Sequence, residues 1–239
     1  MKKSVKFQDS NELWLCDDPK DFDELSAKGL PVIPVAGAVY KLSDFPFTQY
    51  ALEGNSEDYD EEYLYRILLR ILGRPWTILE TERLLVRETT VEDVDRFYEI
   101  YSQPGITDFI ENLFENPEDE KIYTRNYIKD IYGYYNYGIW TVIEKQSNRI
   151  IGRAGISPED GCEYPDLGFV IDKEYQGHGY AFEVCAAIMD YAKNELEFNT
   201  IQARVKPNNL ISVSLLKKLG FKINRKPHQG YLTALHTYA

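Results

Sequence analysis

The sequence predicts an α/β protein of the α+β type, with a small unit over residues 1–76 and a larger one over residues 80–239. Two observations carry this prediction. Short apolar runs alternate with helical patterns along the chain, and the helix-ending sequence Gly73-Arg74-Pro75 closes the first unit. The 239 residues, 44% of them hydrophobic and 28% charged, have the composition of a globular protein.

The first unit is predicted to contain a β-α-β motif. Residues 12–16 have the pattern of a short buried strand, after which Asp18 and Pro19 can cap and open a helix that ends near Gly29. Residues 30–35 follow as a second strand. The connection is short enough for the two strands to pair in parallel.

A third strand is expected at residues 50–52, and a helix over residues 60–72, whose apolar side chains repeat at the spacing of one helix face. Residues 1–76 carry no glycine pattern of a nucleotide-binding loop. We therefore expect the first unit to be a scaffold or to form a homodimer, and its family is unassigned.

The second unit is predicted to begin with a strand at residues 84–87 and a helix that starts at the capping-box pair Thr90 and Asp93. A further helix is expected over residues 117–132. The side chains expected to face the core from this helix are Ile122, Tyr123, Tyr127, Ile128 and Ile131.

Strands then follow closely. Residues 139–143 and 149–156 flank a short polar turn and form a hairpin, and residues 166–171 complete a meander. After a long amphipathic helix, a strand at residues 200–205 and a helix that ends at Gly220-Phe221 are expected.

A glycine-bearing loop joins the strand at residues 166–171 to the long helix. Its residues are Gln176, Gly177, His178, Gly179, Tyr180 and Ala181. Glycine lets the backbone approach a ligand closely, and the free N–H groups and dipole of a helix N-terminus favour an anion. The loop therefore predicts a phosphate site, and backbone amides can form one on a chain whose formal net charge is −12.

Several short motifs of the second unit occur in the same order along the chain as in a known protein family. They are Thr81-Glu82-Arg83-Leu84-Leu85-Val86-Arg87, Ile151-Gly152-Arg153-Ala154-Gly155-Ile156, Gln176-x-x-Gly179-x-Ala181, Asn209-x-x-Ser212 and Lys218-Leu219-Gly220-Phe221. With these motifs, residues 80–239 resemble the GNAT superfamily of N-acetyltransferases, and within it the RimJ/RimL-like ribosomal-protein N-acetyltransferases.

The resemblance implies a GNAT fold, a mixed and mostly antiparallel sheet with flanking helices that is splayed open between its fourth and fifth strands. Acetyl-CoA, the cosubstrate, would lie in the notch. The strand would pair with the pantetheine arm, the loop amides would bind the pyrophosphate, and the last helix would contact the pantetheine or adenosine part. The residues so implied are Phe169, Val170, Ile171, Gln176, Gly177, His178, Gly179, Tyr180, Ala181, Asn209 and Ser212. His178 stands where relatives often carry Lys or Arg.

The family reaction is direct attack of an amine on the thioester, so a base must remove a proton. Asp166 is the leading candidate, because it lies at the substrate end of the splayed strand, and Glu163 and Glu111 are second choices. Leu216 occupies the position where many relatives have a tyrosine acid. The acceptor is expected to be a small-molecule amine or a protein N-terminus. Aromatic side chains expected to line its cleft are Tyr134, Tyr135 and Tyr137.

Composition excludes other classes. The charge of −12 argues against a nucleic-acid partner and is compatible with a cationic amine. No apolar run is long enough to span a membrane, and the basic N-terminus lacks the apolar stretch of a signal peptide, so a cytoplasmic protein is expected. Cys16, Cys162 and Cys185 have no metal-ligand spacing, which predicts reduced thiols and no metal.

Two alternatives stay open. A non-catalytic acetyl-CoA-binding sensor or interaction module would account for Leu216 and for the appended first unit. A P-loop or dinucleotide-binding enzyme fits less well, because the loop lacks Gly-Lys-Ser/Thr and follows a meander.

Overall fold

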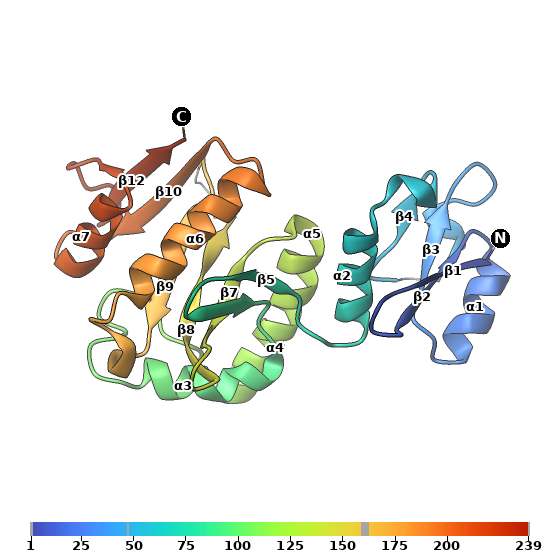
Figure 1. Ribbon diagram of the computed structural model, residues 1–239, viewed down its shortest axis with the longest axis horizontal. Coiled ribbons are helices and arrows are strands. Elements are labelled where there is room, and N and C mark those ends of the chain that lie inside the picture. Colours follow the sequence, from blue (N-terminus) through green and yellow to red (C-terminus); the bar gives the residue numbers. More distant parts are fainter. Residues whose placement is uncertain (1, 47, 159–162, 239) are drawn as a thin grey trace. The chain divides into compact units, whose positions relative to one another are not determined.

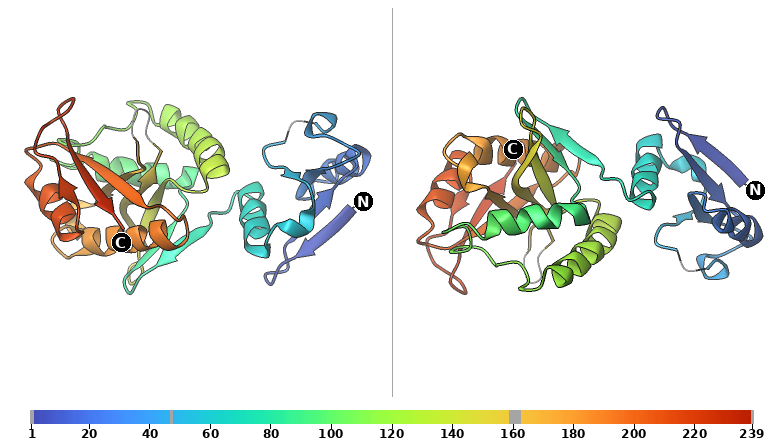
Figure 2. Two further views of the ribbon diagram at one scale, coloured as in Figure 1. Left: turned by 90° about the horizontal axis from the view of Figure 1, so that it is seen from above. Right: turned by 90° about the horizontal axis from the view of Figure 1, so that it is seen from below.

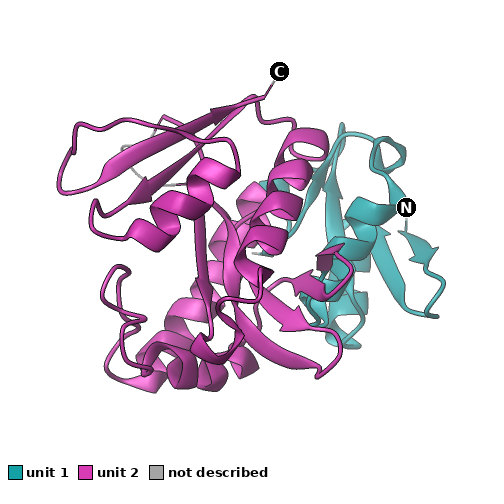
Figure 3. Cartoon of the chain, turned by 60° about the vertical axis from the view of Figure 1, so that its left-hand side comes forward, with its two compact units in different colours: residues 1–76 teal, residues 77–239 magenta. Residues whose placement is uncertain are grey.

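The computed structural model of the chain describes residues 2–46, 48–158 and 163–238, so Cys162 lies outside the described residues. The chain divides into two compact units, Met1–Trp76 and Thr77–Ala239 (Figure 3). Cys16 and Cys185 are free and buried. Within the described ranges, no helix has the length and apolar character needed to cross a membrane.

The described part of unit 1 forms a four-stranded sheet in the order β1-β2-β3-β4 (Figure 1). Its elements are β1 (Lys2–Lys6), β2 (Glu12–Cys16), α1 (Pro19–Ala27), β3 (Val32–Ala36), β4 (Leu52–Glu53) and α2 (Glu61–Ile71), with 3-10 turns at Leu42–Asp44 and Ser56–Asp58. Strands β2, β3 and β4 are parallel, which confirms the β-α-β motif. Strand β1 was not expected from the sequence and pairs antiparallel with β2.

The two helices of unit 1 begin where side-chain caps satisfy their free amides. Asp18 accepts a hydrogen bond from Lys20 N at 2.8 Å, and Asp60 accepts one from Tyr63 N at 2.6 Å. Two separate apolar clusters result, because successive side chains of a strand point to opposite faces. Helix α1 packs on the cluster that contains Cys16, and α2 packs on the cluster that contains Leu15.

The described part of unit 2 forms an eight-stranded sheet in the order β11-β12-β10-β9-β8-β7-β6-β5. Its strands are β5 (Thr77–Glu80), β6 (Leu84–Arg87), β7 (Ile139–Glu144), β8 (Arg149–Ser157), β9 (Asp166–Ile171), β10 (Thr200–Val205), β11 (Lys222–Ile223) and β12 (Leu232–Thr237). Among these described strands, β9 and β10 form the one parallel pair. The mixed, mostly antiparallel sheet is therefore confirmed, while β5, β11 and β12 were not expected.

Strands β9 and β10 meet at one end only. Over their described residues the ladder holds a single pair, Asp166 with Gln202, where Gln202 N also donates to the Pro165 carbonyl at 2.9 Å. By contrast, β9 pairs with β8 along its whole length. The sheet is thus open beyond Asp166, between the strands predicted as the fourth and fifth.

Helices cover both faces of this sheet (Figure 2). They are α3 (Val94–Tyr101), α4 (Pro117–Tyr127), α5 (Gly133–Tyr135), α6 (Tyr180–Asn194) and α7 (Leu210–Lys218), with 3-10 turns at Val91–Asp93 and Lys173–Tyr175 and a π-turn at Ile128–Tyr132. The ring of Trp140 packs on Tyr191 of α6, whereas the next residue, Thr141, donates to Asp93 beside α3 at 2.8 Å. Neighbouring residues of β7 therefore face the two helical layers.

The inward face predicted for the helix at 117–132 is wrong for Ile122 and Tyr123, whereas Tyr127, Ile128 and Ile131 are partly buried. Ile122 and Tyr123 are 51% and 45% exposed, and α4 instead buries Glu120 and Thr124. The buried carboxylate of Glu120 accepts a hydrogen bond from Phe114 N at 3.1 Å, which satisfies part of its polarity and ties the preceding loop to the helix.

Candidate functional site

A cavity of about 910 Å³ lies beside the notch in the sheet of unit 2. Its walls come from the second half of β9, the glycine-bearing loop with the first turn of α6, the start of α7, and the loop after α3. The structure brings these predicted coenzyme residues together on its wall: Phe169, Val170, Ile171, Gln176, Gly177, Gly179, Tyr180, Ala181, Asn209 and Ser212. The segments are far apart in the sequence, so the cavity is a product of the fold.

The glycine-bearing loop adopts a conformation that its glycines permit. Gly177 and Gly179 have φ angles of +80° and +85°, a region that residues with a side chain rarely enter. The Gln176 side chain turns back and donates to the Ile171 carbonyl at 2.8 Å, which ties the loop to the end of β9. Gly179 then caps α6.

The cavity wall at α6 can hold an anion. The first N–H groups of an α-helix have no carbonyl partner within the helix, and the helix dipole adds partial positive charge at the same end. Tyr180 and Ala181 contribute such amides to the wall. A phosphate group fits this arrangement without a basic patch.

The wall at α7 is built around Asn209. Its side-chain oxygen accepts a hydrogen bond from Ser212 N at 3.1 Å, so Asn209 caps the helix. Lys218 also lines the cavity from α7. Its position in the Lys-Leu-Gly-Phe motif was visible in the sequence, but no role could be assigned to it from the sequence alone.

His178 is the predicted coenzyme residue that lies outside the cavity lining. Its carbonyl accepts a hydrogen bond from Arg83 Nη1 at 3.0 Å, and its ring centroid lies 6.4 Å from that of Tyr180. His178 is thus bound to the turn before β6 through its backbone.

Glu183, in the first turn of α6, joins this helix to the turn before β6. Its carboxylate accepts hydrogen bonds from Thr81 Oγ1 at 2.5 Å, Arg83 N at 3.1 Å and Arg83 Nε at 2.7 Å. Burial opposes ionisation of this group, but the hydrogen bonds from Thr81 and Arg83 outweigh it and hold the pKa of the Glu183 carboxyl below its usual value. These contacts give the Thr-Glu-Arg motif a structural role.

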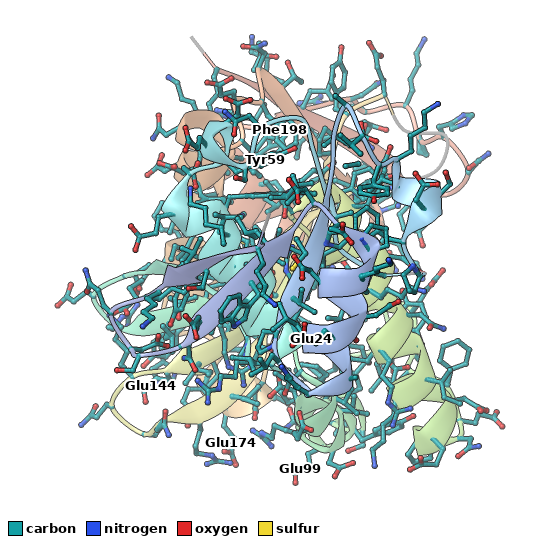
Figure 4. The ribbon with its side chains drawn as sticks, turned by 90° about the vertical axis from the view of Figure 1, so that its right-hand side faces the viewer. Glu24, Tyr59, Glu99, Glu144, Glu174 and Phe198 are labelled. Atoms are coloured by element: carbon teal, nitrogen blue, oxygen red, sulfur yellow. The ribbon has the colours of Figure 1, made fainter. Side chains whose placement is uncertain are left out.

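A second network holds the loop after α3 against the cavity. The buried carboxylate of Asp172 accepts hydrogen bonds from Arg96 and, at 3.1 Å, from Gln103 Nε2. Gln103 Oε1 in turn accepts one from Lys173 N at 2.9 Å. The neighbouring Glu174 points outward, with its carboxylate 3.8 Å from Arg149 Nη1 (Figure 4).

Asp166, the predicted base, lies at the closed end of the notch and outside the cavity lining. Its carboxylate accepts a hydrogen bond from Gln202 Nε2 at 3.3 Å and lies 3.5 Å from Arg204 Nε. Glu163 and Glu111 are exposed, Glu163 beside the Tyr164 hydroxyl and Glu111 next to the cavity residue Ile110. A catalytic role for any of these carboxylates stays a prediction.

The aromatic residues expected at the acceptor cleft form a continuous row. Ring centroids are 4.9 Å apart for Tyr134 and Tyr135, 5.7 Å for Tyr135 and Tyr137, and 5.2 Å for Tyr137 and Phe198. Tyr134 is 79% exposed. Phe198, which follows α6 and is labelled in Figure 4, was not singled out from the sequence. The row lies outside the cavity lining, near the start of β7.

Comparison with known proteins adds to this geometry. Residues 83–222 match the family model described as an acetyltransferase (GNAT) domain. A protein of Bacillus licheniformis described as the uncharacterized N-acetyltransferase p20 is 30% identical over 150 residues, which cover 60% of this chain and 82% of that protein.

Solved structures share the fold of unit 2. An acetyltransferase from Agrobacterium tumefaciens aligns with a TM-score of 0.58 and 21% identity. The alignment covers 67% of this chain and 94% of the Agrobacterium chain. RimL, described as a ribosomal L7/L12 alpha-N-protein acetyltransferase in complex with coenzyme A, aligns with a TM-score of 0.56 and 12% identity. The alignment covers 68% of this chain and 98% of the RimL chain.

Proposed function

This chain is a member of the GNAT acetyltransferase family and an acyl-CoA-dependent N-acyltransferase, and we propose that it transfers an acetyl group from acetyl-CoA to a primary amine. The observation that carries the proposal is the cavity itself, on whose wall the residues expected to bind the coenzyme converge. The coenzyme complex of RimL, which has the same fold, supports coenzyme A as the ligand.

In this proposal the coenzyme follows the cavity wall. The amides of Gly179, Tyr180 and Ala181 bind the pyrophosphate, since they stand at the N-terminus of α6. The β9 edge at residues 169–171 pairs with the pantetheine arm, because the splay leaves its backbone groups free of β10. Lys218 supplies a cation from α7.

The chemical step requires a neutral amine and a stabilised oxyanion. We propose that Asp166 accepts the amine proton through a water molecule, because Gln202 and Arg204 hold its carboxylate at the closed end of the notch. A backbone N–H of β9 would then stabilise the oxyanion of the tetrahedral intermediate. Leu216 has no proton to donate, so we propose that the coenzyme thiolate leaves without help from a side chain at this position or takes its proton from water.

The acceptor is proposed to be an amine with positive charge nearby, either a small molecule or a protein N-terminus. The net charge of −12 attracts such a molecule, and the aromatic row that begins at Tyr134 offers ring faces to a cation. RimL is described as an alpha-N-protein acetyltransferase, so the acceptor of that enzyme is a protein. Membership of the RimJ/RimL-like subgroup is part of this proposal.

The test is thiol release from acetyl-CoA across a panel of polyamines, aminoglycosides, amino acids and peptides. We expect turnover that depends on one acceptor class. A folded protein that binds the coenzyme and shows no acceptor-dependent turnover would contradict the proposal. If coenzyme binding then changed the oligomeric state of the protein, the alternative of a non-catalytic sensor would be favoured. The apolar Leu216, at the position where many relatives have a tyrosine acid, is consistent with this alternative.

A further inference from the structure

Arg83 makes three contacts with the segment proposed to bind the pyrophosphate. Its Nη1 donates to the His178 carbonyl at 3.0 Å, and its Cζ lies 4.2 Å from the ring centroid of Tyr180. Its Nε and Nη2 lie 2.7 and 2.5 Å from Glu183 Oε2. One guanidinium from the turn before β6 thus contacts the loop, the first residue of α6 and the first turn of that helix.

The contact with His178 sets the direction of an amide in the loop. The peptide bond between His178 and Gly179 is trans, so its C=O and N–H point in opposite directions. Because Arg83 holds the carbonyl on its own side, the N–H of Gly179 points away from Arg83. Gly179 also lines the cavity, and a Cβ added to it would be directed toward Arg83, 3.6 Å from Nη2.

The contact with Glu183 removes an electrostatic conflict. A carboxylate in the first turn of α6 stands beside the proposed pyrophosphate, and two like charges repel each other more strongly where water is scarce. Arg83 neutralises this carboxylate and, with Thr81, holds it toward the turn before β6. The free backbone amides of α6 can then bind the phosphate without repulsion from this carboxylate.

We propose that Arg83 is a positioning residue for coenzyme binding, which aims the Gly179 amide at the pyrophosphate and neutralises Glu183. The inference rests on the proposed acetyl-CoA site. It assigns Arg83 no contact with the reacting thioester.

The experiment compares ligands that differ in their phosphates. Dissociation constants are measured by calorimetry for coenzyme A, for 3′-dephospho-coenzyme A and for pantetheine, which has no phosphate. Arg83→Met is expected to raise the dissociation constants of the first two ligands about tenfold, a loss of about 1.4 kcal/mol, and to leave that of pantetheine unchanged. An equal loss for all three ligands, or no loss, overturns the proposal.

Matched variants separate the contributions. Arg149→Met makes the same change in net charge beside Glu174 of the same loop region, and it should leave all three affinities unchanged. If it weakens coenzyme A as much as Arg83→Met does, general charge and not positioning is responsible, and the proposal is overturned. Adding Glu183→Gln to Arg83→Met should recover part of the lost affinity, because it removes the unneutralised carboxylate. No recovery contradicts the neutralising role.

Failure of the proposed function has a different outcome. If the wild-type protein binds neither coenzyme A nor 3′-dephospho-coenzyme A, the acetyl-CoA site is wrong. If it binds both and Arg83→Met binds them equally well, only the role of Arg83 is wrong. Arg83→Lys keeps the positive charge but loses the planar guanidinium group with its several N–H donors. The affinity of this variant for coenzyme A should therefore fall between those of the wild type and Arg83→Met.

Discussion

Gly152 of β8 and Val170 of β9 approach so closely that a Cβ added to Gly152 would lie 2.1 Å from the Val170 carbonyl oxygen. A real Cβ cannot occupy that position without moving the backbone of β9. The first glycine of the Ile-Gly-Arg-Ala-Gly-Ile motif therefore permits the close pairing that places one edge of β9 at the cavity.

We predict that Gly152→Ala displaces β9, lowers the free energy of unfolding by about 1–3 kcal/mol and weakens coenzyme A binding. Chemical denaturation and calorimetry measure the two effects. Gly168→Ala is the matched control, because a Cβ there meets only the terminal Cδ1 of Ile139, at 3.4 Å. Equal effects of the two substitutions would contradict this account.

Gly179→Asp should abolish coenzyme binding. The new side chain forces a φ of +85° on a non-glycine residue, and its carboxylate, directed toward Arg83, would compete with the contacts of Arg83 to the His178 carbonyl and Glu183. Calorimetry with coenzyme A measures the loss. Gly54→Asp, at a φ of +87° in unit 1, carries the same backbone strain and charge and should bind coenzyme A normally. Unchanged affinity of Gly179→Asp would place the phosphates elsewhere.

Asp166→Asn should lower kcat roughly 100-fold while the dissociation constant of coenzyme A stays the same. The reason is that Asp166 lies at the closed end of the notch, away from the residues proposed to hold the phosphates. Steady-state kinetics with the best acceptor and calorimetry provide the comparison. Glu163→Gln and Glu111→Gln serve as parallel variants, and a loss confined to one of these would reassign the base.

The stability that Glu183 contributes should depend on pH. Its pKa is lower in the folded protein than the ordinary value of 4.5, so folding favours the ionised carboxylate. The contribution is fully present above pH 4.5 and is lost as pH falls through the lower, folded-state pKa. Urea unfolding between about pH 7 and pH 3 should show the stability difference between wild type and Glu183→Gln shrinking across this range. A difference that stays the same from about pH 7 to pH 3 would contradict this account.

Elements with local signals could be predicted from the sequence. Helix α1 begins at the Asp18 cap, α6 begins after Gly179, and β9 leads directly into the loop between them, so these features need no knowledge of distant partners. The membership of the GNAT family expected from the motifs is confirmed. Three of these motifs, at residues 176–181, 209–212 and 218–221, contribute residues to the cavity wall, whereas those at residues 81–87 and 151–156 contribute none.

Features that depend on distant partners could not be predicted. Strand β12 exists because it pairs along its length with β10, and its own residues include the polar Thr233 and His236. The exposed face of α4 was assigned to the core because Ile122 and Tyr123 are apolar, yet Tyr123 instead packs on the exposed Phe114. The contact between Arg83 and His178 joins residues 95 positions apart, a relationship that no local pattern contains.

Because β9 and β10 share a single residue pair, the sheet consists of two parts with few hydrogen bonds between them. One piece carries β5 to β9, and the other carries β10 with its long partner β12. A coenzyme arm in the notch would pair with β9 where β10 does not and so connect the two parts of the sheet. Binding should therefore reduce backbone motion at positions far from the phosphates. Amide hydrogen exchange should therefore slow on the second half of β9 when coenzyme A is added, while β7, already paired on both sides, keeps its rate.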